Sequence, residues 1–267
     1  MPGLLLDLDG VLYEGDHAIA GAAEAVAWCR AQGIPRLFLT NTTSRPRRAL
    51  VPKLARMGIE AEAAEILAPP FAAAHWLRQH GAGRCALFVA SASLEEFAGL
   101  PVMDPEYNDQ PAAVVVGNLG QEWSFERLNE AFRLLMSEPR PRLIALGLTR
   151  YWRATDGLQL DAGPFVKALE YASGVDAIVM GKPAAAFFET ALAVLGTSAA
   201  DTWMIGDDIR TDIAAAQHVG IHGLLVRTGK FRPQDLELGI NPDDVLPSIA
   251  ALPAWWRENI QARTGTR

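Results

Sequence analysis

Cysteine is scarce in this sequence, and long apolar runs are missing from it. Of its 267 residues only Cys29 and Cys85 are cysteines, far apart and each in an apolar setting. We therefore expect two buried thiols in a reducing compartment, although the sequence alone does not exclude their pairing. No apolar run reaches the ~18 to 20 residues of a membrane span, and Met1-Pro2-Gly3 carries no basic signal segment. We predict a cytoplasmic protein.

An excess of positive charge is also missing. The 24 Lys and Arg are outnumbered by 31 Asp and Glu, which gives a formal net charge of -7 and an isoelectric point near 5.3. This balance argues against a nucleic acid or an anionic membrane as a partner held by bulk charge. A small phosphorylated molecule stays possible, because a local site can reverse the global sign.

What the sequence does contain is enough apolar material for a large core. Hydrophobic residues make up 50% of the chain and charged residues 21%, which is typical of a globular protein. Single cores stop growing near ~250 residues, so the length favours two domains.

Short apolar runs alternate with amphipathic stretches of helix length, which is typical of an α/β protein with a largely parallel sheet. The predicted strands are residues 4–8, 36–39, 85–90, 112–116, 143–146, 176–180, 202–205 and 224–226. The predicted helices are residues 18–32, 47–57, 71–80, 125–136, 163–171, 184–195 and 213–219.

A break at Ala68-Pro69-Pro70 separates the first strands and helices from a second module that ends near Gly181. We therefore predict one discontinuous domain built from residues 1–70 and 181–267. Residues 71–180 would form a second domain inserted into it.

Four polar clusters lie just past the carboxyl ends of predicted strands, which is where ligands bind in open α/β sheets. The clusters are Asp7-Leu8-Asp9-Gly10, Thr40-Asn41, Lys182-Pro183, and Gly206-Asp207-Asp208 followed by Asp212. Each cluster alone is weak evidence, but together they compose a metal-assisted site for phosphoryl transfer.

The first cluster offers a pair of carboxylates. Residues i and i+2 of a strand share a face, so Asp7 and Asp9 can face one site, and Gly10 lets the backbone turn there. Two carboxylates this close repel, so one needs a proton and the other a cation. This division predicts an ionised nucleophile and a protonated acid, although a lone motif of this kind is more often a turn or a helix cap.

The second and third clusters fit a phosphate. Thr40 and Asn41 supply a hydroxyl, an amide and backbone N–H groups, and Lys182 supplies a point charge. Taken separately, the pair is more often a helix cap and the lysine more often a surface residue.

The last cluster fits a hard cation. Asp207 and Asp208 offer oxygen ligands, and Asp212 is placed to support them from one helical turn further on. The alternative is that these acidic residues only favour the start of a helix.

Together the four clusters resemble the motifs of the haloacid dehalogenase (HAD) superfamily of phosphatases. The insertion is similar to the α/β cap, of C2 type, found in the NagD-like branch. Four further segments narrow the resemblance to one subgroup of that branch: residues 147–151, 160–165, 168–172 and 226–233. The resemblance implies a Rossmann-like parallel-sheet core with an inserted α/β cap, and a homodimer formed through the cap.

The resemblance also implies roles for single residues. Asp7 would be the nucleophile that forms an aspartyl-phosphate, and Asp9 would be the acid for the leaving group and then the base for water. Thr40 and Asn41 would hold the phosphoryl oxygens, and Lys182 would neutralise the negative charge.

Mg²⁺ is the cofactor that the resemblance implies. Its ligands would be the Asp7 carboxylate, the Asp9 backbone carbonyl and Asp207, with water and phosphate completing the octahedron. Gly10, Asp208 and Asp212 would support these ligands. The expected activity is hydrolysis of a small phosphorylated compound: a phosphoamino acid, pyrophosphate or a phosphomonoester.

Other functions compete with this one. A sugar- or nucleotide-phosphate phosphatase would have the same fold. A non-hydrolytic phosphoacceptor signalling domain also uses acidic residues, a threonine and a lysine, but the insertion and Asp207 favour the hydrolase. A dinucleotide-binding domain lacks support, because no G-x-G-x-x-G follows a predicted strand.

Overall fold

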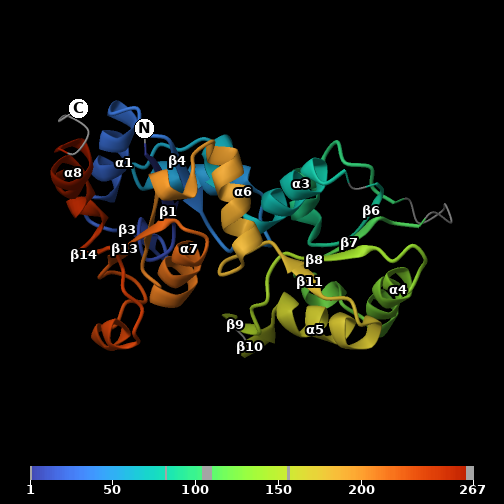
Figure 1. Cartoon of the computed structure of the whole chain (residues 1–267). Helices are drawn as coiled ribbons and strands as arrows, with labels where there is room; N and C mark the ends of the chain where they lie inside the picture. The colour runs from blue at the N-terminus through green and yellow to red at the C-terminus, as the bar shows by residue number, and fades with distance from the viewer. Residues whose placement is uncertain (1, 82, 104–109, 155–156, 263–267) are drawn as a thin grey trace. The chain divides into compact units, whose positions relative to one another are not determined.

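The chain divides into two compact units in a computed structural model that describes residues 2–81, 83–103, 110–154 and 157–262 (Figure 1). The first unit comprises Met1–Thr40, Arg47–Leu67 and Ala191–Arg267, and the second comprises Asn41–Pro46 and Ala68–Thr190. The domain limits predicted above, at residues 70 and 181, stay a prediction. Residues 1 and 263–267 of the predicted core, and 82, 104–109 and 155–156 of the predicted insertion, lie outside the described residues.

A six-stranded parallel sheet forms the centre of the first unit, with the strand order β14-β13-β12-β1-β4-β5. Its strands are β1 (Gly3–Asp7), β4 (Arg36–Leu39), β5 (Ile66–Leu67), β12 (Thr202–Gly206), β13 (His222–Val226) and β14 (Asp244–Leu246). The helices assigned to this unit are α1 (Ala22–Ala31), α2 (Arg47–Arg56), α7 (Ala215–His218) and α8 (Leu252–Trp256), and α6 (Ala185–Leu195) spans the limit between the units. The predicted α/β class is confirmed.

Strand β1 is the most enclosed part of this sheet. All five of its residues are buried, and it pairs with β12 on one side and β4 on the other. Helix α1 presents Ala22, Ala25, Val26 and Cys29 to the same core as Leu4 and Leu6. That spacing is one face of a helix, and each large apolar side chain buried there stabilises the fold by about 1.5–3 kcal/mol.

Two predicted helices begin elsewhere. Residues 18–21 are not helical, because His17–Ala18 (β3) pairs with Tyr13–Glu14 (β2) in a hairpin and Gly21 has a φ of +79°. The helix predicted from residue 213 instead starts with a π-helical segment, η5 (Ile209–Ala214), because Asp208 caps it.

The second unit has its own parallel sheet, with the order β11-β8-β7-β6. The strands are β6 (Cys85–Phe88), β7 (Ala113–Val116), β8 (Arg142–Ala145) and β11 (Ala177–Val179). The helices are α3 (Pro69–Gln79), α4 (Phe125–Leu135) and α5 (Ala162–Ser173), and an antiparallel hairpin joins β9 (Tyr151–Ala154) to β10 (Gly157–Leu160). In its core Trp123 stacks between Phe88 and Phe165.

Both cysteines are free and buried. Burial raises the pKa of the Cys29 thiol to about 11 and also raises that of Cys85, so both are inert at neutral pH. Within the described ranges, no helix has both the length and the apolar character that crossing a membrane requires.

Candidate active site

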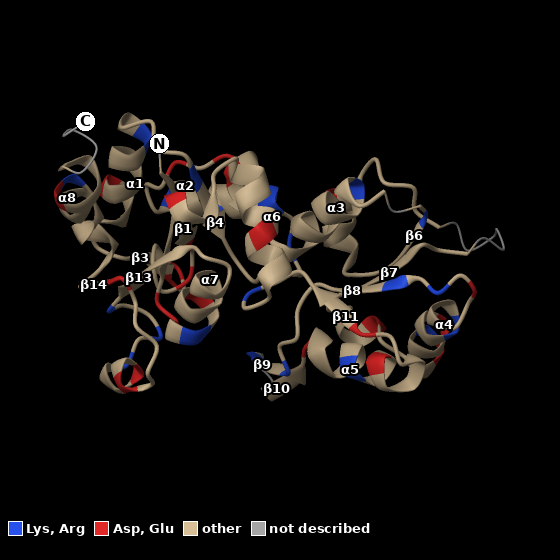
Figure 2. Cartoon of the chain, viewed as in Figure 1, with Lys and Arg blue, Asp and Glu red and all other residues tan. Residues whose placement is uncertain are grey.

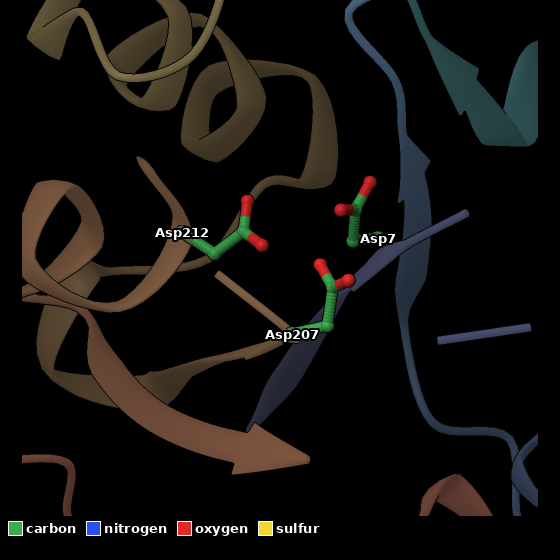
Figure 3. Close-up of side chains that lie close together, drawn as sticks. All are labelled: Asp7, Asp207 and Asp212. Carbon is green, nitrogen blue, oxygen red and sulfur yellow. The ribbon is translucent and has the colours of Figure 1, made fainter. Parts of the chain in front are cut away.

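Three buried carboxylates meet at the carboxyl edge of the first unit's sheet. Asp7 is the last residue of β1, Asp207 directly follows β12, and Asp212 lies in η5. Figure 3 shows the three side chains pointing toward one another, and one oxygen of each lies within 4.8 Å of the others. They are 5%, 1% and 0% exposed, respectively.

The sheet register and one cap bring these carboxylates together. Parallel pairing of Leu6 with Ile205 places the ends of β1 and β12 side by side. Asp208 then accepts hydrogen bonds from the backbone N–H groups of Arg210 and Thr211, both at 3.0 Å. These bonds start η5 and bring Asp212 back toward Asp208, whose N–H donates to Asp212 Oδ2 at 3.2 Å.

The same bonds explain the acidity of Asp208. Burial alone would raise the pKa of this carboxyl group, but the hydrogen bonds from Thr211 and Arg210 and the charge of Lys230 outweigh burial and lower it. Asp208 is therefore ionised at neutral pH and committed to holding the start of η5.

This donor set fits a divalent cation. Three carboxylates so close in a buried place repel strongly unless a cation or protons offset their charge. Asp207 Oδ2 is engaged by a backbone N–H, while its Oδ1 is buried and accepts no hydrogen bond from the described residues. Carboxylate oxygens are the ligands that hard ions such as Mg²⁺ prefer.

A loop after β13 braces these residues, and we call Thr228, Gly229 and Lys230 the clamp loop. The Thr228 hydroxyl donates to the Gly10 carbonyl at 2.5 Å, and the Gly229 N–H donates to Glu14 at 2.9 Å. The Lys230 N–H donates to Asp207 Oδ2 at 2.6 Å. One short segment thus fixes both the turn after Asp9 and the orientation of Asp207.

Glycine is required at two facing positions of this arrangement. Gly10 and Gly229 have φ angles of +82° and +64°, a region that favours glycine. A Cβ added at either residue would collide with the Asp207 carboxylate and approach the other glycine's Cα. The two loops therefore pack backbone against backbone around Asp207.

Asp9 lies apart from the three carboxylates, and it is exposed. The Tyr13 hydroxyl donates to Asp9 Oδ2 at 3.5 Å. Burial raises the pKa of Tyr13, and the charges of Asp9 and Asp7 raise it further, so this phenol remains a neutral donor. Asp212 is thus the third carboxylate of the cluster, and the part predicted for Asp9 stays a prediction.

Two predicted phosphate ligands are brought together in the second unit. Asn41 Oδ1 accepts from the Lys182 N–H at 2.8 Å, and Asn41 Nδ2 donates to the Lys182 carbonyl at 3.0 Å. This reciprocal pair fixes the backbone of a lysine that follows 141 residues later. Thr40 belongs to the first unit, where it is buried beside the end of β4.

Sequence reasoning missed the clamp loop as a functional element. Residues 226–233 carried only a family resemblance, and nothing local shows that Thr228 contacts Gly10, which lies 218 positions earlier. The available signal was Gly229 among polar residues just after a predicted strand end.

Known proteins are similar to this chain over nearly its whole length. The family described as "Haloacid dehalogenase-like hydrolase" matches residues 4–99, and that described as "HAD-hyrolase-like" matches residues 179–252. The phospholysine phosphohistidine inorganic pyrophosphate phosphatase of Homo sapiens is 42% identical over 237 residues, 87% of this chain and 85% of that protein. The haloacid dehalogenase-like hydrolase domain-containing protein 2 of Bos taurus is 40% identical over 242 residues, 91% of this chain and 90% of that protein.

Solved structures give the same result. The p-nitrophenyl phosphatase from Archaeoglobus fulgidus has a TM-score of 0.82 and 30% identity, covering 94% of this chain and 97% of that one. NagD from E. coli K-12 has a TM-score of 0.83 and 25% identity, with the same coverage of 94% and 97%.

Proposed function

Because the chain belongs to the haloacid dehalogenase-like hydrolases, as its motifs predicted, we propose that it hydrolyses small phosphorylated compounds with Mg²⁺ through an aspartyl-phosphate. Its relatives identify the enzyme class as phosphatase. The observation that carries the finer proposal is the cluster of Asp7, Asp207 and Asp212, three buried carboxylates within 4.8 Å. Such a cluster lowers the stability of the fold unless a cation or protons offset its charge, and proteins keep costly groups of this kind where they serve function.

In the first step, an oxygen of the Asp7 carboxylate attacks phosphorus, and the bond from phosphorus to the leaving-group oxygen breaks. The proton of Asp9 passes to that oxygen. In the second step, water attacks the phosphorus of the aspartyl-phosphate and gives its proton to Asp9. Inorganic phosphate leaves, and the Asp7 carboxylate is restored. The Tyr13 hydroxyl, which donates to Asp9 Oδ2 at 3.5 Å, would help to orient this carboxyl group.

Asp7, Asp207 and the Asp9 carbonyl would hold Mg²⁺, which would supply positive charge to offset that of the phosphoryl group. Asp212 and Asp208 support these ligands, and Gly10 permits the turn. Thr40 and the backbone of Asn41 would hold phosphoryl oxygens, while Lys182 would neutralise the remaining charge. The Asn41 side chain favours this assignment, because it fixes the Lys182 backbone.

The substrate class follows from the relatives only in outline. A phosphoamino acid, pyrophosphate or a phosphomonoester remains the proposal, with sugar and nucleotide phosphates as the neighbouring alternative. A signalling domain that accepts phosphate without releasing it is the alternative of a different class. It would form the aspartyl-phosphate but show no turnover.

The Asp9→Asn variant tests this mechanism. It loses both proton transfers but leaves Asp7 able to attack, so an activated aryl phosphate should still phosphorylate the protein. We expect phosphate on Asp7, detected by mass spectrometry after rapid mixing and acid quench, while steady turnover falls by orders of magnitude. Wild-type protein under the same quench is the control. Little loss of rate and no trapped adduct in Asp9→Asn would refute the role of Asp9.

We keep the discontinuous core, the inserted cap and the cytoplasmic location as parts of this proposal, together with a homodimer formed through the cap. The β9–β10 hairpin supports the dimer, because Tyr151, Leu158 and Leu160 are 52%, 62% and 59% exposed. The pairing of Tyr151 with Leu160 and of Arg153 with Leu158 places these apolar side chains on one face. Light scattering on Leu158→Ser should report monomers if this face is the interface, and an unchanged dimer would exclude it.

A further inference from the structure

The first unit contains an open pocket of about 410 Å³, and one of its lining residues, Asp208, directly follows Asp207 in the chain. Its lining residues are Asp208, Ile209, Arg210, Lys230, Arg232 and Asp235. Figure 2 shows basic positions just below α7 and on the loop below β13, in an otherwise acidic chain. The pocket therefore collects three of the chain's 24 positive side chains at one place.

The carboxylates of the two acidic residues in this pocket accept hydrogen bonds from backbone N–H groups. Asp208 Oδ1 accepts from Arg210 N and Thr211 N at 3.0 Å each, and Asp235 Oδ2 accepts from Arg232 N at 2.7 Å. Each carboxylate thus fixes the backbone of an arginine that lines the pocket.

Unlike the two acidic residues, the three basic residues of the pocket make no such side-chain interactions within the described part of the chain. Among the described residues, the side chains of Arg210, Lys230 and Arg232 take part in no hydrogen bond and no ion pair. The charge of Lys230 contributes to lowering the pKa of Asp208, although no hydrogen bond or ion pair joins these two described side chains. Cations left without partners around a hollow are suited to an anion, which guanidinium groups bind with two parallel hydrogen bonds.

The backbone connects this pocket to the proposed reaction centre. The Lys230 N–H donates to Asp207 Oδ2 at 2.6 Å, and Asp208 is the next residue after Asp207. Two residues that line the pocket, Lys230 and Asp208, are therefore joined directly to Asp207, the first by a hydrogen bond and the second by a peptide bond.

We propose that Arg210, Lys230 and Arg232 bind a second anionic group of the substrate, a phosphate or a carboxylate other than the phosphoryl group that is hydrolysed. This inference rests on the proposed function and narrows it to small substrates with two negatively charged groups. The pocket lies wholly within the first unit, so this selection is made by the core.

The kinetic test compares substrates that differ in one charge. Glycerol 3-phosphate and 3-phosphoglycerate have the same spacing and differ by a carboxylate, while pyrophosphate carries a second phosphate. In the Arg210→Gln/Arg232→Gln variant, kcat/KM for one or both doubly anionic compounds should fall about 10- to 100-fold, mainly through KM. Glycerol 3-phosphate and p-nitrophenyl phosphate should stay within about twofold of wild type. A fall in kcat/KM for 3-phosphoglycerate would identify the bound group as a carboxylate, and a fall for pyrophosphate would identify it as a phosphate.

Arg227→Gln is the matched control, because Arg227 is exposed on the same loop but does not line the pocket. An equal fall for all four substrates, or no fall for any of them, would overturn the proposal. So would an equal effect of Arg227→Gln.

Calorimetry separates this inference from the proposed function. Two proteins are compared: the Asp7→Asn protein, which lacks the nucleophile, and the combined variant that also carries Arg210→Gln and Arg232→Gln. Each is titrated with pyrophosphate and, separately, with 3-phosphoglycerate in the presence of Mg²⁺. At least one ligand should bind about 10- to 100-fold more weakly to the combined variant. This result is expected even if the wild type hydrolyses none of the compounds, in which case only the proposed function fails. Equal affinities, or no binding of either ligand to Asp7→Asn, would refute the pocket.

Discussion

At the carboxyl ends of β1 and β12, Asp7 and Asp207 lie buried with Asp212 within 4.8 Å. At the amino ends of β13 and β14, acidic residues have hydrogen-bonding partners instead. His222 Nδ1 lies 3.1 Å from Asp243 Oδ1, and Trp255 Nε1 donates to Asp244 at 2.7 Å. The same sheet therefore pairs its acids at one end and crowds them at the other.

The physical cost differs accordingly. A paired acid near the surface adds modest stability, whereas like charges crowded in a buried place subtract from it. Ring stacking adds to the paired end, where Trp203 packs against His222 at 4.3 Å between centroids. This contrast is the one expected if the carboxyl end serves the proposed chemistry and the amino end stabilises the fold.

Of the changes considered, replacing the proposed nucleophile at the carboxyl end of the sheet should have the largest effect on activity. Asp7→Asn removes the attacking charge, so kcat should fall by at least about a thousandfold. The same change removes one of three crowded negative charges, so the thermal midpoint in a chelator should equal or exceed that of wild type. Near wild-type turnover would refute the covalent mechanism, and a marked loss of stability would refute the crowding argument.

Removing the metal should have the next largest effect. Activity should be lost on exhaustive chelation and return with Mg²⁺, while Ca²⁺ should inhibit because its longer, looser coordination misplaces the nucleophile. Saturating Mg²⁺ should also stabilise the fold, by about 2.7 kcal/mol at a hundredfold excess over Kd. Thermal unfolding with and without Mg²⁺ measures this, and Asp207→Asn should show a smaller gain. Full activity in chelator would contradict the prediction.

A side chain at Gly229 tests whether the carboxylates need the clamp loop. In Gly229→Ala the added Cβ would collide with the Asp207 carboxylate and the Gly10 Cα. Activity should therefore fall about 10- to 100-fold, and the Mg²⁺ concentration needed for half-maximal activity should rise. Gly239→Ala is the control, because Gly239 has a similar φ of +74° but open space around it. It should lose only about 1 kcal/mol of stability. Equal activities of the two variants would show that the contact with Asp207 is unimportant.

The smallest effect is expected from replacing Asp243, which lies at the amino end of the sheet. Burial would raise the pKa of Asp243, but hydrogen bonds from the Gly223 N–H and His222 outweigh it and lower the pKa. A carboxyl group with a depressed folded pKa stabilises above its unfolded pKa, near 3.9, and loses that contribution as pH falls through the folded value.

Asp243→Asn should therefore be less stable than wild type by about 1 kcal/mol or less at pH 7, because the pair is partly exposed. Below about pH 4 the two proteins should converge, as urea unfolding at several pH values would show. Catalysis should not change. A difference that grows toward low pH would contradict the assigned sign.

The sequence was sufficient where one local signal decides the structure. The run at residues 36–39 is β4 with the predicted ends, because apolar residues there are flanked by turn-forming ones. Polar clusters at strand ends led to Asp7 and Asp207, because parallel strands bring their carboxyl ends to one edge.

Long-range contacts decide what the sequence could not give. Asp212 was expected as a supporting residue, but its place within the carboxylate cluster depends on a π-helical segment that the Asp208 cap starts, and helical spacing alone does not distinguish this segment from an ordinary helix. Thr228 reaches Gly10 only through the assembled sheet. Hairpin β2–β3 is two residues per strand, too short for any alternation pattern.

The position of β1 has a consequence for synthesis on the ribosome. β1 pairs with β12, so about 135 residues separate the end of β5 from the strand that completes the centre of the sheet. At roughly 5–20 residues per second, the apolar edge of β1 waits about 7 to 27 seconds for its neighbour. The second unit's sheet draws all its strands from residues 85–179, so it is complete before that partner emerges. Translation speed through this middle stretch therefore sets how long the nascent amino-terminal strands remain open to aggregation.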